Sequence, residues 1–227
     1  MNGIWILLLL VLVAALPAII VYIWYRVKKY EVSLPWFLAA IAAGMVSLVA
    51  AGMIQRFFIP GGSGFSLLFF GIFSRIAFVE ELSRLITLIP LLAVAGSRRL
   101  NVSLAFSTAI GLVSGLGFAL LENAFHGTAD INITLLRIIT TAPLHGTCGI
   151  RAGAAIFLFR KDRPKALYNF IFAVLIHGTY NLIIINPTLP SALAIIVAYF
   201  ALLTSLPYLK PGNTDSENTK ISPDSNP

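Results

Sequence analysis

The chain has 227 residues, of which 58% are hydrophobic and 11% charged, and its mean hydropathy is +0.90. This composition excludes an ordinary soluble domain and indicates a membrane protein. The formal net charge of +7 would also suit a nucleic-acid-binding protein. In a multi-span protein, however, the bias of basic residues toward cytoplasmic loops explains such a charge, so we expect no nucleic-acid partner. A single cysteine, Cys148, permits no disulfide within the chain and argues against a cysteine-based metal site.

Apolar segments of about 20 residues, long enough to cross a bilayer, recur along most of the chain. We predict about seven transmembrane helices, near residues 3–24, 36–54, 65–95, 101–125, 132–159, 166–185 and 189–208. As one continuous helix the third would exceed the hydrocarbon thickness, which allows for a break within it. The predicted fold class is all-α: a polytopic membrane helix bundle forming a single transmembrane domain over 1–210. A disordered cytoplasmic tail is expected over 211–227, which is rich in Pro, Ser, Asn and Asp.

Basic residues are concentrated in alternate loops between these spans. The second, fourth and sixth loops carry only Arg56, whereas the first, third and fifth carry Arg26, Lys28, Lys29, Arg98, Arg99, Arg160, Lys161, Arg163 and Lys165. Because positively charged loops stay on the cytoplasmic side, the N-terminus is predicted to lie outside and the C-terminus in the cytoplasm. The expected location is the cell membrane, as a multi-pass protein in contact with the lipid bilayer.

Two adjacent glutamates, Glu80 and Glu81, lie inside the third predicted span, with Arg84 one turn further on. An ionised carboxylate at bilayer depth costs at least ~2.5–3.5 kcal/mol, so such residues indicate a functional site. An arginine this close can keep one glutamate ionised, while like-charge repulsion favours protonation of the other, which is how sites assign a base and an acid. The alternative is a structural ion pair that only neutralises two buried charges.

The fourth predicted span carries Glu122 near its end, together with glycines at 111, 115 and 117 whose small-xxx-small spacing lets a neighbouring helix approach closely. Glu122 is either a further site residue or a side chain that extends to the membrane interface. By helical rise it lies closer to the outer surface than Glu80 and Glu81, so a tilt or a kink would be needed to bring it level with them.

Two histidines lie near mid-bilayer depth, His145 in the fifth predicted span and His177 in the sixth. Asn181 follows His177 at i, i+4 spacing, so both can point toward one place. A lone histidine on an apolar helix is more often a core residue. Two histidines at the depth of two or three carboxylates instead indicate a cavity in which water is activated.

Two chemistries fit these residues. In the first, His145, His177 and Glu122 hold zinc with an open position for water, and another glutamate is the base. In the second, a glutamate activates water directly while the histidines and Asn181 stabilise the oxyanion. The chain has no HExxH zinc motif. The candidate catalytic residues are Glu80, Glu81, Glu122, His145 and His177.

The chain resembles the PrsW family of intramembrane proteases in four segments that follow one another in the expected order. These are VEELSR around Glu80, Glu81 and Arg84; GLGFALLENAF around Phe118, Glu122 and Asn123; Arg137 followed by APLHG with His145; and LIHGTYNL around His177 and Asn181. The wider group of CAAX-processing and bacteriocin-processing membrane proteases is similar in its paired glutamates and HxxxN motif. Those enzymes have a histidine four residues after a phenylalanine, where this chain has Phe118 and Glu122, which favours the PrsW family.

This resemblance implies a membrane endopeptidase of the metallo- or glutamate type that acts on membrane-anchored protein substrates. It also implies a role like site-1 cleavage of a regulator such as an anti-sigma factor. Arg84, Asn123, Arg137 and Asn181 would then be supporting residues. Two alternatives remain open on the residues alone: a proton-coupled transporter or channel that uses the buried Glu/His groups as a relay, and a non-catalytic membrane scaffold of the same fold.

Overall fold

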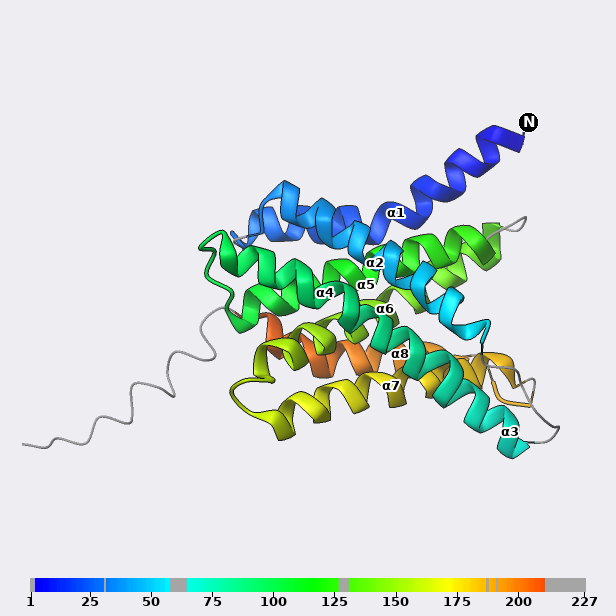
Figure 1. Cartoon of the computed structure of the whole chain (residues 1–227). Coiled ribbons are helices and arrows are strands. Elements are labelled where there is room, and N and C mark those ends of the chain that lie inside the picture. The colour runs from blue at the N-terminus through cyan, green and yellow to red at the C-terminus, as the bar shows by residue number, and fades with distance from the viewer. Residues whose placement is uncertain are drawn as a thin grey trace, which may run out of the picture.

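A computed structural model describes residues 3–30, 32–57, 65–126, 131–186, 188–190 and 192–210 of the chain. These residues form helices and connections without any strand, which confirms the predicted all-α class. The helices pack side by side as a bundle, and the N-terminal part of the first one projects beyond it (Figure 1). The predicted tail over 211–227 lies outside the described residues.

Each of the seven predicted segments coincides with helix. The elements are α1 (Gly3–Val27), α2 (Leu34–Gln55), α3 (Phe65–Phe70), η1 (Gly71–Phe78), α4 (Val79–Ser97), α5 (Leu104–His126), α6 (Ile131–Leu158), α7 (Arg163–Ile185), α8 (Ala192–Ser205) and η2 (Leu206–Leu209). Four stretches of the described chain are long and apolar enough to cross a membrane: Leu34–Gln55, Leu104–Phe125, Arg163–Ile185 and Ala192–Leu209. The chain is therefore a helical membrane protein, while the number of crossings and the side of each end stay predictions.

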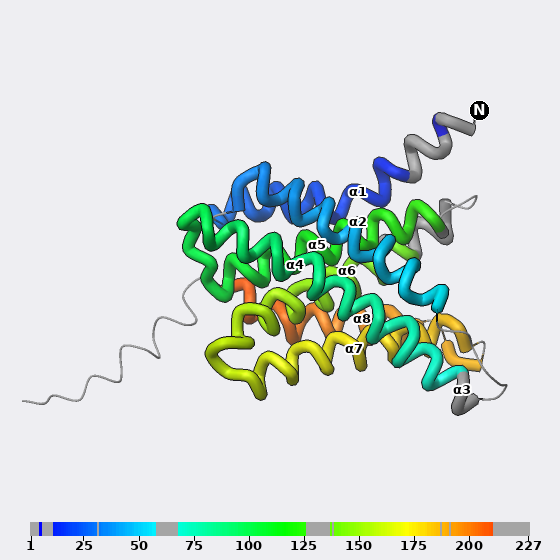
Figure 2. Tube along the Cα trace, in the orientation of Figure 1, coloured from blue at the N-terminus to red at the C-terminus, as the bar shows by residue number. Residues whose placement is uncertain are grey.

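The third predicted span contains no gap. Its segments α3, η1 and α4 follow one another directly, and η1 is π-helical over Gly71–Phe78 (Figure 2 traces the same path as a tube). The break allowed for on length grounds is thus a π-helical stretch, which keeps the backbone hydrogen-bonded within the segment as an apolar environment requires. This stretch ends at Phe78, two residues before Glu80, so the paired glutamates follow it directly at the start of α4.

Helix α5 lies at the centre of the bundle. In its apolar stretch of 18 residues 83% of the residues are buried, whereas 28% to 33% are buried in the corresponding stretches of the other three candidate spans. Its glycines face other backbones: a methyl group at Gly111 would meet the carbonyl oxygen of Gly149, and one at Gly115 would meet that of His145. The predicted close approach of a neighbouring helix is confirmed, and the neighbour is α6. This contact fixes the position of His145 against α5.

The connections α1–α2, α4–α5 and α6–α7 lie at one end of the bundle (Figure 1, left). These connections and the helix ends beside them carry the basic residues that the sequence places in the first, third and fifth loops. Helix α7 begins at this end with Asp162 as its N-cap, whose Oδ1 accepts a hydrogen bond from the Lys165 backbone N at 3.0 Å.

A buried arginine joins the last three helices. Arg151 on α6 is 3% exposed, and its Nε donates to Ser205 Oγ at 2.9 Å. Its Nη1 donates to Asn169 Oδ1 and its Nη2 to the carbonyl oxygen of Thr204, each at 3.0 Å. Arg137 pairs with the Glu122 carboxylate, whereas Arg151 is held by neutral acceptors from α7 and α8 and makes no ion pair within the described residues.

Candidate active site

Four helices bring the five predicted catalytic residues into one connected cluster. Glu80 and Glu81 come from the start of α4, Glu122 from α5, His145 from α6 and His177 from α7. Glu81, His145 and His177 are 1% to 2% exposed. The two imidazole rings meet edge to face, with centroids 4.9 Å apart and planes at 87°. All five side chains are thus linked by direct contacts in the interior of the bundle.

Glu81 is the fixed carboxylate of the pair. Arg84 lies one turn along α4, with its Nε 3.2 Å from Glu81 Oε2 and its Nη2 donating to Glu81 Oε1 at 3.3 Å. The Nε contact is an ion pair that is not aligned for a hydrogen bond. The same Oε1 lies 2.8 Å from His177 Nδ1. Because Arg84 is fully buried beside it, Glu81 is neutralised within the protein and can orient His177.

Glu80 has a different environment from its neighbour. Its Oε1 accepts a hydrogen bond from Gln55 Nε2 at 3.1 Å, and its Oε2 lies 3.4 Å from His177 Nε2. That separation is too long for a good hydrogen bond, in contrast to the 2.8 Å contact on the other side of the ring. No guanidinium of the described residues reaches this carboxylate, so Glu80 keeps a carboxylate oxygen free for chemistry.

Glu122 reaches the cluster even though counting along the span placed it nearer the surface. Its Oε2 lies 2.8 Å from His145 Nε2, and its Oε1 lies 3.0 Å from Arg137 Nη2. Helix α5 is continuous over this region. Asn123 Oδ1 accepts hydrogen bonds from Arg137 Nε at 3.0 Å and from Thr141 Oγ1 at 3.1 Å, which holds the arginine against Glu122.

Arg84 also contacts the second histidine. Its Nη1 donates to the carbonyl oxygen of His145 at 3.1 Å, and its Nη2 lies 3.4 Å from His145 Nδ1. The Phe118 ring lies beneath both groups, with its centroid 4.7 Å from the Arg84 Cζ and 4.6 Å from the imidazole centroid. One buried cation therefore organises Glu81 and His145 together.

These partners give the two histidines opposite tautomers when they are neutral. His177 Nδ1 faces the Glu81 carboxylate and must carry the proton, which leaves the lone pair on Nε2 toward Glu80. His145 Nδ1 faces an arginine N–H and must accept, so Nε2 carries the proton and donates to Glu122. His177 is therefore prepared to bind a positive centre, and His145 to donate a hydrogen bond.

Asn181 is the predicted site residue that the structure does not join to the cluster by a contact. It lies one turn after His177 on α7 and is half-buried. Within the described residues its side chain makes no hydrogen bond. A substrate carbonyl is the kind of partner it was predicted to take.

A divalent metal fits this donor set best at His177. A metal-binding histidine usually donates its other ring N–H to a carboxylate, and Glu81 is placed to accept from His177 in that way. Three carboxylates, those of Glu80, Glu81 and Glu122, meet the guanidinium groups of only two arginines, Arg84 and Arg137. With neutral imidazoles and all three carboxylates ionised, the cluster would carry one negative charge in excess, which a cation or a proton shared by Glu80 and His177 would offset.

Two contacts of the cluster were missed by sequence reasoning. Gln55, at the end of α2, fell outside the predicted span, and only its place one residue before the loop could have drawn attention to it. Cys148 was set aside because a lone cysteine argues against a metal site. The structure brings ligand atoms of Glu81, Cys148 and His177 within 4.8 Å of one another, a group that could hold a metal ion. Glu81 is also paired with Arg84, so its carboxylate is only partly available to a metal.

The model of one protein family, described as PrsW family intramembrane metalloprotease, matches residues 32–206 of the chain. This range includes every residue of the cluster and most of the helical bundle. Neither the curated proteins nor the solved structures contain a match to the chain.

Proposed function

This chain belongs to the PrsW family of intramembrane metalloproteases, and from that premise we propose that its buried cluster hydrolyses peptide bonds of membrane-associated proteins. The observation that carries the proposal is the contrast between the two glutamates. Glu81 is paired with Arg84 and His177 Nδ1, whereas Glu80 Oε2 faces the lone pair of His177 Nε2 at 3.4 Å. A free carboxylate beside an oriented imidazole is what water activation requires.

The proposed topology has seven membrane crossings, with the N-terminus outside and the C-terminus in the cytoplasm of a cell that carries the protein in its plasma membrane. The basic loops at one end of the bundle support this orientation. It places the cluster at membrane depth, so the substrate is a membrane-anchored protein. A regulator such as an anti-sigma factor, cleaved at a first site, is the substrate class that the family resemblance favours.

In the proposed mechanism Glu80 is the general base. Its Oε2 takes a proton from water as the water oxygen attacks the scissile carbonyl carbon, and the electron pair of the carbonyl moves onto oxygen. Glu80 then returns the proton to the amide nitrogen as the C–N bond breaks and the carbonyl re-forms. Gln55 fixes the other oxygen of this carboxylate, so Oε2 keeps its direction.

The remaining residues orient the two histidines and stabilise the charge that develops on the substrate. Asn181 presents its amide N–H groups as donors for the oxyanion that forms on the carbonyl oxygen, while His145 donates its Nε2–H to Glu122. Glu122, held by Arg137 and Asn123, sets the orientation of His145. Arg84 keeps Glu81 ionised, so that the carboxylate accepts a hydrogen bond from the protonated Nδ1 of His177.

His177 Nε2 is the group that would hold a divalent metal such as zinc; Glu122, predicted as another ligand, already has both carboxylate oxygens in contact with His145 and Arg137. When bound, the metal would polarise the attacking water and lower its pKa. His145, which was predicted as a third ligand, is better suited to donate a hydrogen bond because Arg84 occupies its Nδ1 side.

The deciding experiment measures cleavage of a membrane-anchored substrate by the purified protein in liposomes. Glu80→Gln keeps the shape and the hydrogen bond from Gln55 but removes the base, so we expect a loss of at least about 100-fold in rate with unchanged thermal stability. Glu217→Gln, a matched change in the C-terminal tail, should leave the rate unchanged. Full activity of folded Glu80→Gln would overturn the proposed role.

A further inference from the structure

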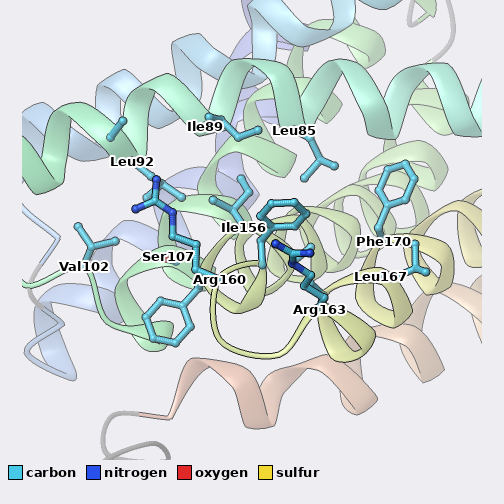
Figure 3. A pocket seen from close by; sticks show the side chains of 15 residues that line it. Leu85, Ile89, Leu92, Val102, Ser107, Ile156, Arg160, Arg163, Leu167 and Phe170 are labelled. Carbon is cyan, nitrogen blue, oxygen red and sulfur yellow. The ribbon is translucent and has the colours of Figure 1, made fainter.

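A large apolar cavity opens between α4, α6 and α7 at the basic end of the bundle. Its volume is about 1060 Å³. Figure 3 shows the side chains of Leu85, Ile89 and Leu92 from α4 opposite Leu167 and Phe170 from α7, with Ile156 of α6 between them. A cavity of this size and lining can take a ligand as large as a lipid chain.

Two arginines stand at the edge of this apolar surface. Arg160 and Arg163 line the cavity, and both are exposed. The Arg163 Cζ lies over the Phe159 ring, 5.8 Å from its centroid. The neighbouring carboxylate, Asp162, pairs instead with Lys165 at 3.1 Å, and no other carboxylate of the described chain forms an ion pair with either arginine. Two cations without an acidic partner at the mouth of an apolar cavity match a ligand with an anionic head and an apolar tail.

We propose that this cavity binds an anionic phospholipid. The acyl chains pack against the leucines and aromatic rings of α4 and α7, and the phosphate oxygens accept hydrogen bonds from Arg160 and Arg163. Basic pockets between transmembrane helices are typical sites for anionic headgroups on the cytoplasmic side, which is the side that the basic loops predict for this end.

The lining favours a lipid over a segment of a protein substrate. Among the residues that line the cavity, only Ser107, Arg160 and Arg163 have polar side chains. A peptide extended for cleavage would need partners for each of its backbone N–H and C=O groups, because none are available from water at this depth. An acyl chain has no such groups, and one anionic headgroup suffices for both arginines.

The test measures lipid binding to the full-length, detergent-purified protein by native mass spectrometry, with dioleoyl-phosphatidylglycerol and dioleoyl-phosphatidylcholine as probes. We expect the anionic lipid to bind preferentially, and Arg160→Gln/Arg163→Gln to weaken its binding by about thirtyfold, since each arginine near an anionic headgroup contributes a factor of about five. Arg98→Gln/Arg99→Gln removes the same charge at the same end without changing the cavity lining, and it should weaken binding by less than about threefold.

A second pair of variants tests the apolar part. Ala93 lines the cavity, whereas its neighbour Val94 is exposed without lining it. Ala93→Trp should fill the cavity and abolish binding, and Val94→Trp should not. Equal binding of both lipids, equal loss in the two arginine double variants, or equal competition by glycerol phosphate without acyl chains would overturn the proposal. So would photocrosslinking from position 93 to a protein substrate in place of lipid. None of these readouts involves proteolysis, so their outcome is independent of the catalytic proposal.

Discussion

The amide Nε2 of Gln55 donates to Oε1 of Glu80 across 3.1 Å, and this bond links the end of α2 to the start of α4. The backbone oxygen of the same Gln55 accepts from Arg75 Nε at 3.3 Å, within the π-helical stretch that precedes Glu80. The proposed base is therefore held by Gln55, whose own backbone is tied to the π-helical stretch through Arg75.

Gln55→Leu should lower the catalytic rate by about 10- to 100-fold, because Glu80 loses the partner that fixes its orientation. The Michaelis constant should change little, since Gln55 makes no proposed contact with substrate. Arg56→Gln, at the next position, is the control and should behave like the unchanged protein. A rise in the Michaelis constant with an unchanged rate would place Gln55 in substrate binding instead.

Arg84→Met should destabilise the fold by about 3–5 kcal/mol, because it leaves the Glu81 carboxylate buried without a partner. Thermal unfolding in detergent measures the change. The double variant Glu81→Gln/Arg84→Met should regain part of the loss, since both charges are then absent. Simple addition of the two single effects would show that the pair does not act as a unit.

Gly115→Ala should destabilise the protein by about 1–3 kcal/mol, because the added methyl group meets the carbonyl oxygen of His145 and must push α6 away from α5. Activity should fall with it, since His145 moves. Gly52→Ala on α2 is the matched control: its methyl group would have no atom within 4 Å, so stability should not decrease. Equal effects at both positions would argue against a tight α5–α6 contact.

Metal content distinguishes the two histidines. In protein purified without chelator, His177→Ala should lose a bound zinc ion, whereas His145→Ala should retain most of it because Arg84 occupies the Nδ1 side of His145. His126→Ala, at the remaining histidine of the chain, is the control. Equal loss in both cluster variants would restore His145 as a ligand. Unmodified protein free of metal would favour water activated by glutamate alone.

The sequence was sufficient to predict the helices because each is apolar over a length that suits a bilayer. It also identified the ionisable residues of the cluster, since Glu80, Glu81 and Glu122 are conspicuous in apolar surroundings. Counting along one helix could not place Glu122 beside the other groups, because it leaves the tilt of the helix open. In the structure the Glu122 carboxylate reaches His145, which joins it to the cluster.

The separate roles of Glu80 and Glu81 were beyond sequence reasoning. Both are within one turn of Arg84, and spacing alone cannot tell which carboxylate the arginine faces. The π-helical stretch leads directly into α4 and sets the direction of its first residues, and no residue pattern in the sequence predicted it. Gln55 and Cys148 were missed for a similar reason, since a polar side chain at a span end and a small side chain in an apolar run are ordinary in membrane helices.

The three hydrogen bonds of Arg151 have a consequence for how the protein is made. The acceptors at Thr204 and Ser205 leave the ribosome more than 50 residues after Arg151. Until α8 arrives, α6 and α7 carry a guanidinium with most of its partners missing in an apolar environment, which is strongly unfavourable. The insertion of α8 therefore completes the burial of Arg151, and a chain truncated before residue 204 would leave this charge unsatisfied within the bilayer.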